Sequence, residues 1–372
     1  MMSSTTTPSG QQGSFFATQD ILFAAFYAAI VFPGVIGNGI IITIVRKTPS
    51  MHTTTNYLLM NLAVADLLTL LLCPGLYDFA LTKVRLQGFL GDVICKLFAG
   101  NAVVPITINV AVLTVCTIAV ERYLALVKPF RNLRLTKDTV GYVIALLWLI
   151  ALLTCVPDIQ ANTFDIESNN YPCKRPWSLD EYYLHKSFII FTCVCFGFLS
   201  FLIIFICYFE IVRGLYFTQT ICSETSASET ERHEKKQLAR LLIWLAIIFA
   251  VCSLPFASFF LYLISANHAA VLDKYETLYL LHRISRFLLF ANSFFNPLLY
   301  ALQSSNYRNN FRLLFKSKVR CCKPFESNSV QDTSYRQRTT GTILSDNCEY
   351  ALKRITENTG NCQSKTDDKI GV

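Results

Sequence analysis

Seven stretches of mostly apolar residues alternate with short polar segments along the chain. Each is close to the ~20 residues that a helix needs to cross a bilayer, and about twice as long as a spanning strand. They cover roughly residues 21–45, 57–81, 94–123, 139–157, 187–213, 238–264 and 277–301. The pattern predicts an all-α membrane protein, with a bundle of seven transmembrane helices over residues 21–303.

Lysine and arginine residues lie on alternate sides of these stretches. They follow the first, third, fifth and seventh spans, as in Arg46-Lys47 and Arg308 to Lys316, whereas residues 1–20 contain none. Because basic loops stay in the cytoplasm, we expect an extracellular N-terminus and a cytoplasmic C-terminus.

Three segments lie outside the predicted bundle. Residues 1–20 are polar and predict a disordered extracellular tail. Residues 304–320 place Tyr307, Phe311 and Phe315 against basic residues, which predicts a short amphipathic helix on the cytoplasmic membrane face. Residues 321–372 are rich in Ser and Thr and predict a disordered cytoplasmic tail.

Composition agrees with a membrane protein and excludes several functions. Of 372 residues, 53% are hydrophobic and only 16% are charged, whereas soluble domains are about a quarter charged. The net charge of +8 is spread over the flanks of the spans, so no nucleic-acid partner is expected. The five histidines form no metal-binding pattern. The sequence also lacks the internal repeat that is typical of transporters. We therefore expect neither an enzyme nor a metal cofactor beyond a possible sodium ion.

The fourteen cysteines fall into three groups, which lie in the apolar spans, in or beside the extracellular loops, and in the cytoplasmic segment. Most lie within apolar spans, where a free thiol behaves as a small hydrophobic group. Cys95 and Cys173 lie in or beside extracellular loops, where an oxidising environment favours a disulfide between them. Cys321 and Cys322 follow a basic amphipathic stretch in the cytoplasm, which favours palmitoylation, although two unmodified thiols are the alternative.

Polar residues within the spans predict a polar seam through the bundle. Asp66 is deep in the second span, and Asn292, Ser293 and Asn296 lie in the seventh, where Pro297 interrupts the helix. A bare carboxylate is too costly there, so Asp66 must be protonated, hydrogen-bonded or bound to a cation. At the end of the third span, Glu121-Arg122 is either a paired functional site or an arginine that reaches the lipid headgroups.

Taken in order, these motifs resemble the rhodopsin-like (class A) G-protein-coupled receptors over about residues 21–320. The matching residues are Gly37-Asn38, Leu62 to Asp66, Cys95, Glu121-Arg122-Tyr123 with Pro129, Trp148, Tyr208, Phe249 with Cys252 and Pro255, and Asn296-Pro297 with Tyr300. The segment 53–66 further resembles peptide-binding members such as galanin, neuropeptide FF and allatostatin-type receptors.

The resemblance implies a role for each motif. Arg122 contacts the G protein when the sixth helix swings outward, Glu121 holds Arg122 in the inactive state, and Pro129-Phe130 forms an apolar knob against the G protein. Switch residues shared with the family are Tyr208, Phe249, Pro255, Asn296, Pro297 and Tyr300. Asp66, with Asn292 and Asn296, is the implied sodium site. Arrestin, a receptor kinase and membrane lipid are the further implied partners.

The sequence departs from the family pattern at three informative positions. Ser253 stands where the family usually has a tryptophan beneath the ligand, and Ser200 replaces the usual proline of the fifth span. Lys235 stands where some members have an acidic partner for Arg122, so we expect no ionic lock between the third and sixth helices.

The outer ends of the spans supply the candidate ligand-binding residues. These are Tyr77, Asp78, Phe256, Phe260, His282, Arg283, Arg286 and Phe290. The third span lacks the carboxylate of an amine receptor, and Phe290 stands where retinal receptors have a lysine. We expect a plasma-membrane receptor for a neuropeptide that activates heterotrimeric G proteins. The alternatives are a lipid, nucleotide or other small anionic ligand or, less favoured, a transporter, and a salt bridge to Asp78 is the alternative role for Arg286.

Overall fold

The computed structural model describes residues 9–73, 89, 93, 103–128, 135–157, 163–164, 173–174, 187–188, 190–214, 229–266, 271, 273–304 and 307–313. Within these ranges, side chains are described except at 9–20, 163–164, 173–174, 229–236, 238 and 242. The chain divides into two compact units, Met1–Phe311 and Arg312–Val372. The long helices described below belong to the first unit.

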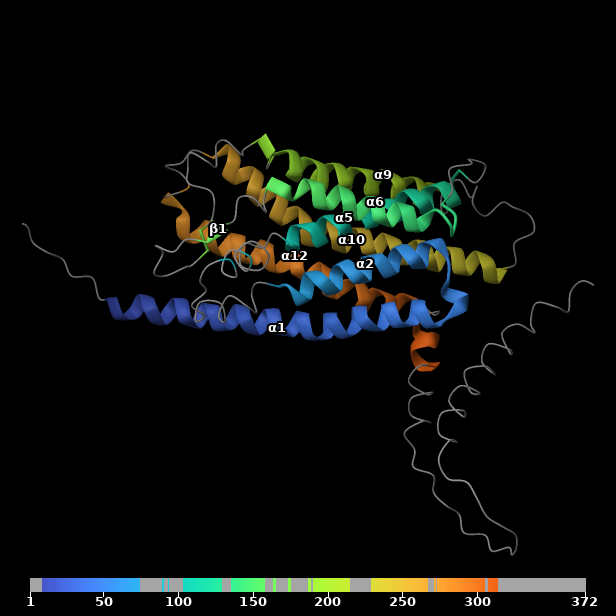
Figure 1. Cartoon of the computed structure of the whole chain (residues 1–372), viewed down its shortest axis with the longest axis horizontal. Coiled ribbons are helices and arrows are strands. Elements are labelled where there is room, and N and C mark those ends of the chain that lie inside the picture. The colour runs from blue at the N-terminus through green and yellow to red at the C-terminus, as the bar shows by residue number, and fades with distance from the viewer. Residues whose placement is uncertain are drawn as a thin grey trace, which may run out of the picture. The chain divides into compact units, whose positions relative to one another are not determined.

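Seven long helical segments of the described chain correspond one to one to the seven predicted spans (Figure 1). They are α1 (Ser9–Lys47), α2 (Thr54–Leu71), α5 (Val103–Leu126), α6 (Val140–Thr154), the π-helix η3 (Cys193–Leu199) continued by α9 (Ser200–Val212), α10 (Glu229–Ser265) and α12 (Tyr275–Gln303). The prediction of a seven-helix all-α bundle is confirmed.

The remaining regular elements are short. The 3-10 helix η1 (Pro49–Met51) connects α1 to α2. Strands β1 (Thr163–Phe164) and β2 (Cys173–Lys174) pair antiparallel, with Phe164 opposite Cys173. Residues 307–313 are helical and lie within the predicted amphipathic helix.

Local sequence signals explain where several helices end. The side chain of Thr53 accepts a hydrogen bond from the backbone N–H of Asn56 at 3.3 Å, so it caps the first turn of α2. Helix α1 ends at Lys47, two residues before Pro49. Pro33, Pro255 and Pro297 lie inside α1, α10 and α12. In a bundle, neighbouring helices can satisfy the backbone groups that such prolines free.

Helix α1 differs from the prediction at its N-terminal end. Residues 9–20, which we expected to be a disordered tail, are helical and continuous with the first span. Once the apolar segment from Ile21 onward has formed a helix, each added turn carries no new nucleation cost. No proline interrupts residues 9–20, so helix elongation outweighs the polar composition.

Five of the helices are long and apolar enough to cross a membrane. The stretches, found among the described residues, are Ile21–Lys47, Thr54–Leu71, Val103–Leu126, Ile190–Val212 and Ala239–Ser265. Helix α6 is apolar but shorter, at 15 residues, and α12 has 29 residues and includes Arg283 and Arg286.

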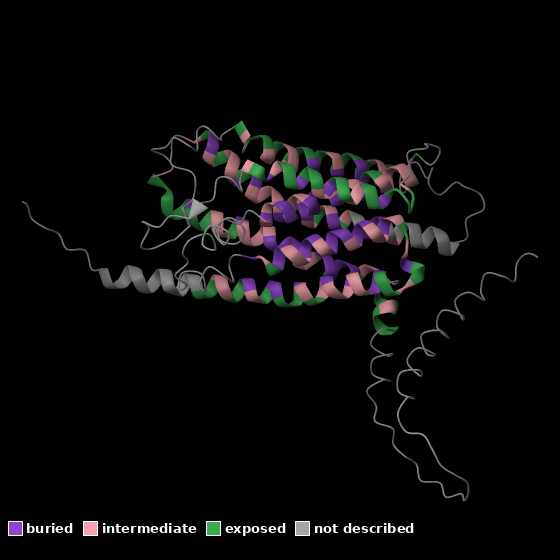
Figure 2. Ribbon diagram, in the orientation of Figure 1, coloured by how far each residue is buried: buried purple, intermediate pink, exposed green. Residues whose placement is uncertain are grey.

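The buried residues gather on α2 and α5 in the middle of the bundle (Figure 2). Helix α1 contacts α2 and α12, α5 contacts α2, α6 and α9, and α10 contacts α12. Large apolar side chains such as Phe32, Leu153 and Phe205 are exposed instead of buried. Contiguous exposed apolar surface is costly in water but suits a lipid environment.

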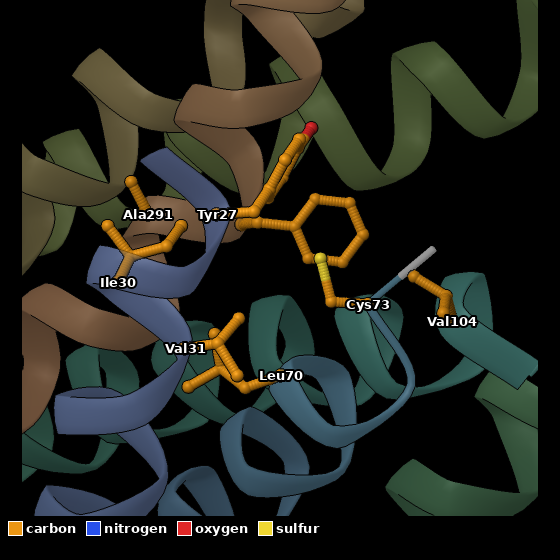
Figure 3. Packing of buried hydrophobic residues seen from close by; sticks show 8 residues of the cluster. Tyr27, Ile30, Val31, Leu70, Cys73, Val104 and Ala291 are labelled. Carbon is orange, nitrogen blue, oxygen red and sulfur yellow. The ribbon is translucent and has the colours of Figure 1, made fainter. Parts of the chain in front are cut away.

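One hydrophobic cluster joins α1, α2, α5 and α12 (Figure 3). It contains Tyr27, Ile30, Val31, Leu70, Cys73, Val104, Phe290 and Ala291. The rings of Tyr27 and Phe290 meet edge to face, with centroids 5.9 Å apart. This core cluster fixes the position of α12 against the first two helices, directly beside the polar residues described below.

Replacing Gly37 by Ala should destabilise the contact between α1 and α12. A Cβ atom at Gly37 would lie 2.8 Å from Cβ and 2.9 Å from Cγ of Pro297, whose ring is rigid. Overpacking of this kind costs about 1–3 kcal/mol. We expect a lower melting temperature of the purified protein, measured by size-exclusion chromatography after heating.

The matched control is Gly39→Ala, two residues further along the same helix. A Cβ atom at Gly39 meets nothing within 4 Å. Alanine is favoured over glycine inside a helix by about 0.5–1 kcal/mol. Gly39→Ala should therefore preserve or slightly raise the melting temperature, and equal losses for both variants would contradict the packing argument.

Candidate functional site

Asp66 of α2 is the centre of a buried polar network. It is 0% exposed, and both carboxylate oxygens accept hydrogen bonds from α12. Ser293 Oγ donates to Oδ1 and Asn296 Nδ2 donates to Oδ2, each at 2.7 Å. Asn296 directly precedes Pro297 in the last third of α12, so the proline lies in the same helical turn as the residues that bind Asp66. The bonds offset the cost of burying the carboxyl group among apolar helices.

The same network extends to α1. Asn38 is fully buried, and its Nδ2 donates to the backbone oxygens of Gly34 and Ser293, each at 2.9 Å. Ser293 therefore bonds α2 through its side chain and α1 through its backbone. The polar seam predicted from the sequence is a physical connection among three helices.

A second group of hydrogen bonds links α2 to α5 and α6. Asn61 Nδ2 donates to Thr114 Oγ1, and Asn61 Oδ1 accepts from Trp148 Nε1, both at 2.9 Å. Thr69 Oγ1 donates to Thr107 Oγ1 at 2.8 Å. These bonds hold α2 between its neighbours, which is the structural use of polar residues in transmembrane bundles.

Several buried polar atoms near the seam have no hydrogen-bond partner among the described residues. They are Oδ1 of Asn38, Asn292 and Asn296, and the hydroxyls of Tyr208 and Tyr300. A buried polar atom without a partner is costly, so these atoms are candidates to bind an ion or water. Asn292 and Asn296 are the residues predicted to assist Asp66 in binding sodium.

Glu121 and Arg122 form an ion pair at the end of α5. Arg122 Nε lies 2.6 Å from Glu121 Oε2, and Arg122 Nη2 donates to Oε1 at 3.2 Å. Thr55 Oγ1 of α2 donates to Oε2 at 3.3 Å. The side chains of Arg122 and Glu121 are only 16% and 11% exposed. This favours the paired arrangement over an arginine that reaches the lipid headgroups. Tyr123 follows and is half-buried.

The predicted switch residues lie on three neighbouring helices. Tyr208 of α9, Phe249 of α10, and Asn296, Pro297 and Tyr300 of α12 are buried, while Pro255 of α10 is half-buried. The Tyr300 ring stacks on Tyr307, with centroids 5.5 Å apart.

Tyr307 ties the segment after α12 back to α2. Its hydroxyl donates to Asn56 Oδ1 at 3.4 Å, and burial raises the pKa of Tyr307. This contact anchors the end of α12 beside the first turn of α2.

The π-helix η3 forms where the fifth span lacks its proline. Ser200 Oγ donates to the backbone oxygen of Cys195 at 2.8 Å, across the widened turn. A Cβ atom at Gly197 would lie 3.0 Å from Ala257 Cβ, so the glycine lets η3 approach α10 closely. Serine therefore occupies the place of the proline and satisfies a carbonyl that the irregular turn leaves free.

Aromatic rings lie close to His282 in the first third of α12. The imidazole lies 5.4 Å from the Phe259 ring, 6.2 Å from Phe260 and 6.3 Å from Phe256, measured between centroids. The sequence analysis missed Phe259, although it lies between two residues that were selected. Its position three residues after Phe256, on the same helix face, is the signal that would have found it.

The two arginines beside His282 have different surroundings. The Arg283 guanidinium lies 4.1 Å from the centroid of the Phe23 ring in α1 and 5.6 Å from that of Tyr279. This contact gives Arg283 a role in holding α1 against α12, which the sequence did not reveal. Arg286 is half-buried and forms no hydrogen bond or ion pair with the residues that the structure describes. Phe290 is packed into the core cluster.

Several predicted site residues lie outside the described residues. They are Tyr77, Asp78, Cys95, Pro129, Phe130, Cys321 and Cys322. Cys173 is described only as a backbone position in β2. The disulfide, the apolar knob and the palmitoylation sites therefore stay predictions.

Comparison with known proteins agrees with the geometry. The chain is 27% identical to the tachykinin-like peptides receptor 86C of Drosophila melanogaster, with 82% of the chain and 60% of that receptor covered. The match therefore spans less than two thirds of this relative's length. It is also 27% identical to the QRFP-like peptide receptor of Branchiostoma floridae (80% of the chain, 78% of the relative) and to the galanin receptor type 2 of Rattus norvegicus (81% and 77%).

The sequence profile of the 7 transmembrane receptor (rhodopsin family) matches residues 37–300. This range includes Asn38, Asp66, the Glu121–Arg122 pair and Tyr300, so it covers the whole polar seam. The chain is a multi-pass membrane protein that belongs to the rhodopsin family of seven-transmembrane receptors.

Proposed function

We propose that this protein is a plasma-membrane receptor that couples binding of an extracellular peptide to activation of a heterotrimeric G protein. The observation that carries the proposal is the polar seam from Asn38 through Asp66 to Asn296, in a bundle whose other end holds the half-buried Glu121–Arg122 pair. Buried polar groups are costly in a membrane and are characteristically functional. The N-terminus is extracellular and the ends of α5 and α12 are cytoplasmic.

The peptide nature of the ligand rests on the relatives and on the outer end of α12. The relatives described above are named as receptors for tachykinin-like peptides, QRFP-like peptides and galanin. The outer end offers the aromatic rings around His282 and the half-buried Arg286. Aromatic surface suits apolar side chains, and a guanidinium suits carbonyl or carboxylate groups.

Signalling follows from a shift between two arrangements of the bundle. A ligand that binds one arrangement better increases its population. Tyr208 and Tyr300, buried on α9 and α12, take part in the transition together with Phe249. Because Ser253 replaces the usual tryptophan, the rings of Phe256 and Phe259 around His282 carry the ligand's effect to α10.

The experiment that tests this function is a ligand screen in cells. The full chain is expressed with sensors for each Gα class and exposed to a library of amidated peptides. A peptide response that disappears in cells lacking the receptor supports the proposal. A response to lipids or nucleotides, with none to peptides, would overturn the peptide assignment and favour the anionic ligand that Arg286 could also accept.

We further propose that Asp66 holds a sodium ion with the help of Asn292 and Asn296. The residues fit a monovalent ion, because a single carboxylate balances one positive charge. The buried Oδ1 atoms of both asparagines have no partner among the described residues and are suitable oxygen ligands. No group of three acidic, histidine or cysteine residues that would suit a divalent metal occurs in the described ranges.

Replacing Asp66 by Asn should remove the effect of sodium on agonist affinity. The variant keeps the size of the side chain and loses its charge. In radioligand binding with an agonist from the screen, we expect affinity to be equal in sodium and in N-methylglucamine buffers. An unchanged salt response in Asp66→Asn would exclude this ion site.

The other predicted features complete the proposal. A Cys95–Cys173 disulfide ties the second extracellular loop to the third helix, and Pro129-Phe130 contacts the G protein. Cys321 and Cys322 carry palmitoyl groups that anchor the amphipathic helix to membrane lipid. The Ser- and Thr-rich tail is phosphorylated by a receptor kinase and then binds arrestin.

A further inference from the structure

A side chain of α10 caps the end of α12. Gln237 Nε2 donates a hydrogen bond to the backbone oxygen of Gln303 at 2.6 Å. Gln303 is the last residue of α12, and Gln237 is half-buried in the first third of α10. The bond therefore joins two helices at the end of the bundle that contains the Glu121–Arg122 pair.

The acceptor is well suited to such a bond. The last four carbonyls of a helix have no partner within the helix and carry a partial negative charge. The neighbouring carbonyl of Leu302 accepts a hydrogen bond at 2.5 Å from Nη1 of Arg308, which lies just beyond the end of α12. The carbonyl of Gln303 instead takes its donor from α10, so the capping of α12 depends on where α10 lies.

Among the residues whose side chains the structure describes, Arg122 forms no hydrogen bond or ion pair with α10. Its guanidinium is engaged by Glu121 on its own helix. In the sequence, Lys235 stands where an acidic partner for Arg122 could have been. The Gln237–Gln303 bond is a contact within the described residues that can restrain the end of α10.

We propose that the Gln237–Gln303 hydrogen bond is a latch that keeps the end of α10 against α12 and limits ligand-independent signalling. The inference rests on the proposed receptor function, because it assigns the latch to the resting arrangement. Any movement that separates these two helix ends breaks the bond and exposes the carbonyl of Gln303.

Three variants test the latch. Gln237→Ala removes the donor, and Gln237→Glu keeps the shape but replaces the donor with a negative charge near a helix C-terminus. Gln303→Ala is the matched control, because the bond uses the backbone oxygen and this variant retains it. The first readout is ligand-independent G-protein activation, normalised to receptor at the cell surface.

We expect basal signalling to rise about 3- to 10-fold in Gln237→Ala, as the loss of one net hydrogen bond shifts a two-state equilibrium by such a factor. Basal signalling should rise at least as much in Gln237→Glu, and in Gln303→Ala it should equal that of the unmodified receptor. Basal signals that do not change in the Gln237 variants, or that rise equally in Gln303→Ala, would overturn the latch.

A second readout needs neither ligand nor G protein. Hydrogen–deuterium exchange of the purified full chain in nanodiscs reports the opening of residues 229–241, the first part of α10. Faster exchange of these residues in both Gln237 variants supports the latch if the exchange rate in Gln303→Ala equals that of the unmodified chain. Faster exchange without a change in basal signalling would reduce Gln237 to a structural cap and reject its regulatory role.

The two readouts separate the inference from the function on which it rests. If no agonist or basal signal of any Gα class depends on the receptor, the proposed function fails. The exchange measurement then still decides whether Gln237 holds α10. If agonists do activate the receptor and the Gln237 variants behave as the unmodified chain in both assays, only the latch fails.

Discussion

Replacing Arg122 by Ala should abolish G-protein activation while the receptor still reaches the cell surface. Arg122 lies at the end of α5, and its side chain is only 16% exposed in a pair with Glu121. Keeping a charged guanidinium largely buried at the end of a transmembrane helix costs free energy, which indicates that Arg122 has a functional role. We expect agonist-stimulated and basal signals to fall to the level of cells without receptor, measured with G-protein sensors.

The matched control is Arg46→Ala. Arg46 also lies at the end of a transmembrane helix, on the side that the basic residues mark as cytoplasmic, but it is exposed. Its replacement should leave signalling intact. Glu121→Gln should act in the opposite direction to Arg122→Ala, because it frees Arg122 from its charged partner and should raise basal signalling. Normal activation by Arg122→Ala at equal surface expression would contradict the assignment.

The number of helices and the polar seam could be predicted because membranes impose simple rules. A spanning helix needs a long apolar run, and a buried polar side chain must find a partner. Asp66, Ser293 and Asn296 were therefore expected to meet, and they do, at 2.7 Å. The sequence alone did not predict that Asn38 bonds the backbone of Ser293, because an acceptor carbonyl exists at every residue.

The orientation of each helix was harder to predict. In a membrane protein the lipid-facing side is as apolar as the core, so the periodicity that marks the buried face of a soluble helix is weak. Gly37 and Gly39 look equivalent in the sequence, yet only Gly37 lies against Pro297. Likewise, the sequence shows that Ser200 replaces a proline, but it does not show that a π-helix precedes Ser200 or that Gly197 lies close to Ala257.

Replacing Arg286 should cost most of the agonist potency, even when the replacement is lysine. Arg286 precedes Asn296 by ten residues, which is about 15 Å along the helix. It lies between the rings around His282 and the buried Phe290, and it has no hydrogen bond or ion pair within the described part of the chain. A half-buried guanidinium in this position is available to a carboxylate or carbonyl group of the ligand.

A forked pair of hydrogen bonds from arginine is a geometry that lysine lacks. Losing a buried contact of this kind costs about 2–5 kcal/mol, or roughly 30-fold or more in potency. Arg286→Ala and Arg286→Lys should both show this loss in a concentration–response assay, at normal surface expression. Full potency in Arg286→Lys would exclude the forked contact.

Arg283→Lys is the matched control on the same turn of α12. The Arg283 guanidinium lies 4.1 Å from the centroid of the Phe23 ring, a cation–π contact that an ammonium group can also make. Potency should therefore survive in Arg283→Lys and fall in Arg286→Lys. The competing role for Arg286 is a salt bridge to Asp78. If Asp78→Ala loses as much potency as Arg286→Ala, and the double variant loses no more, Arg286 orders the outer end of the bundle and does not bind the ligand directly.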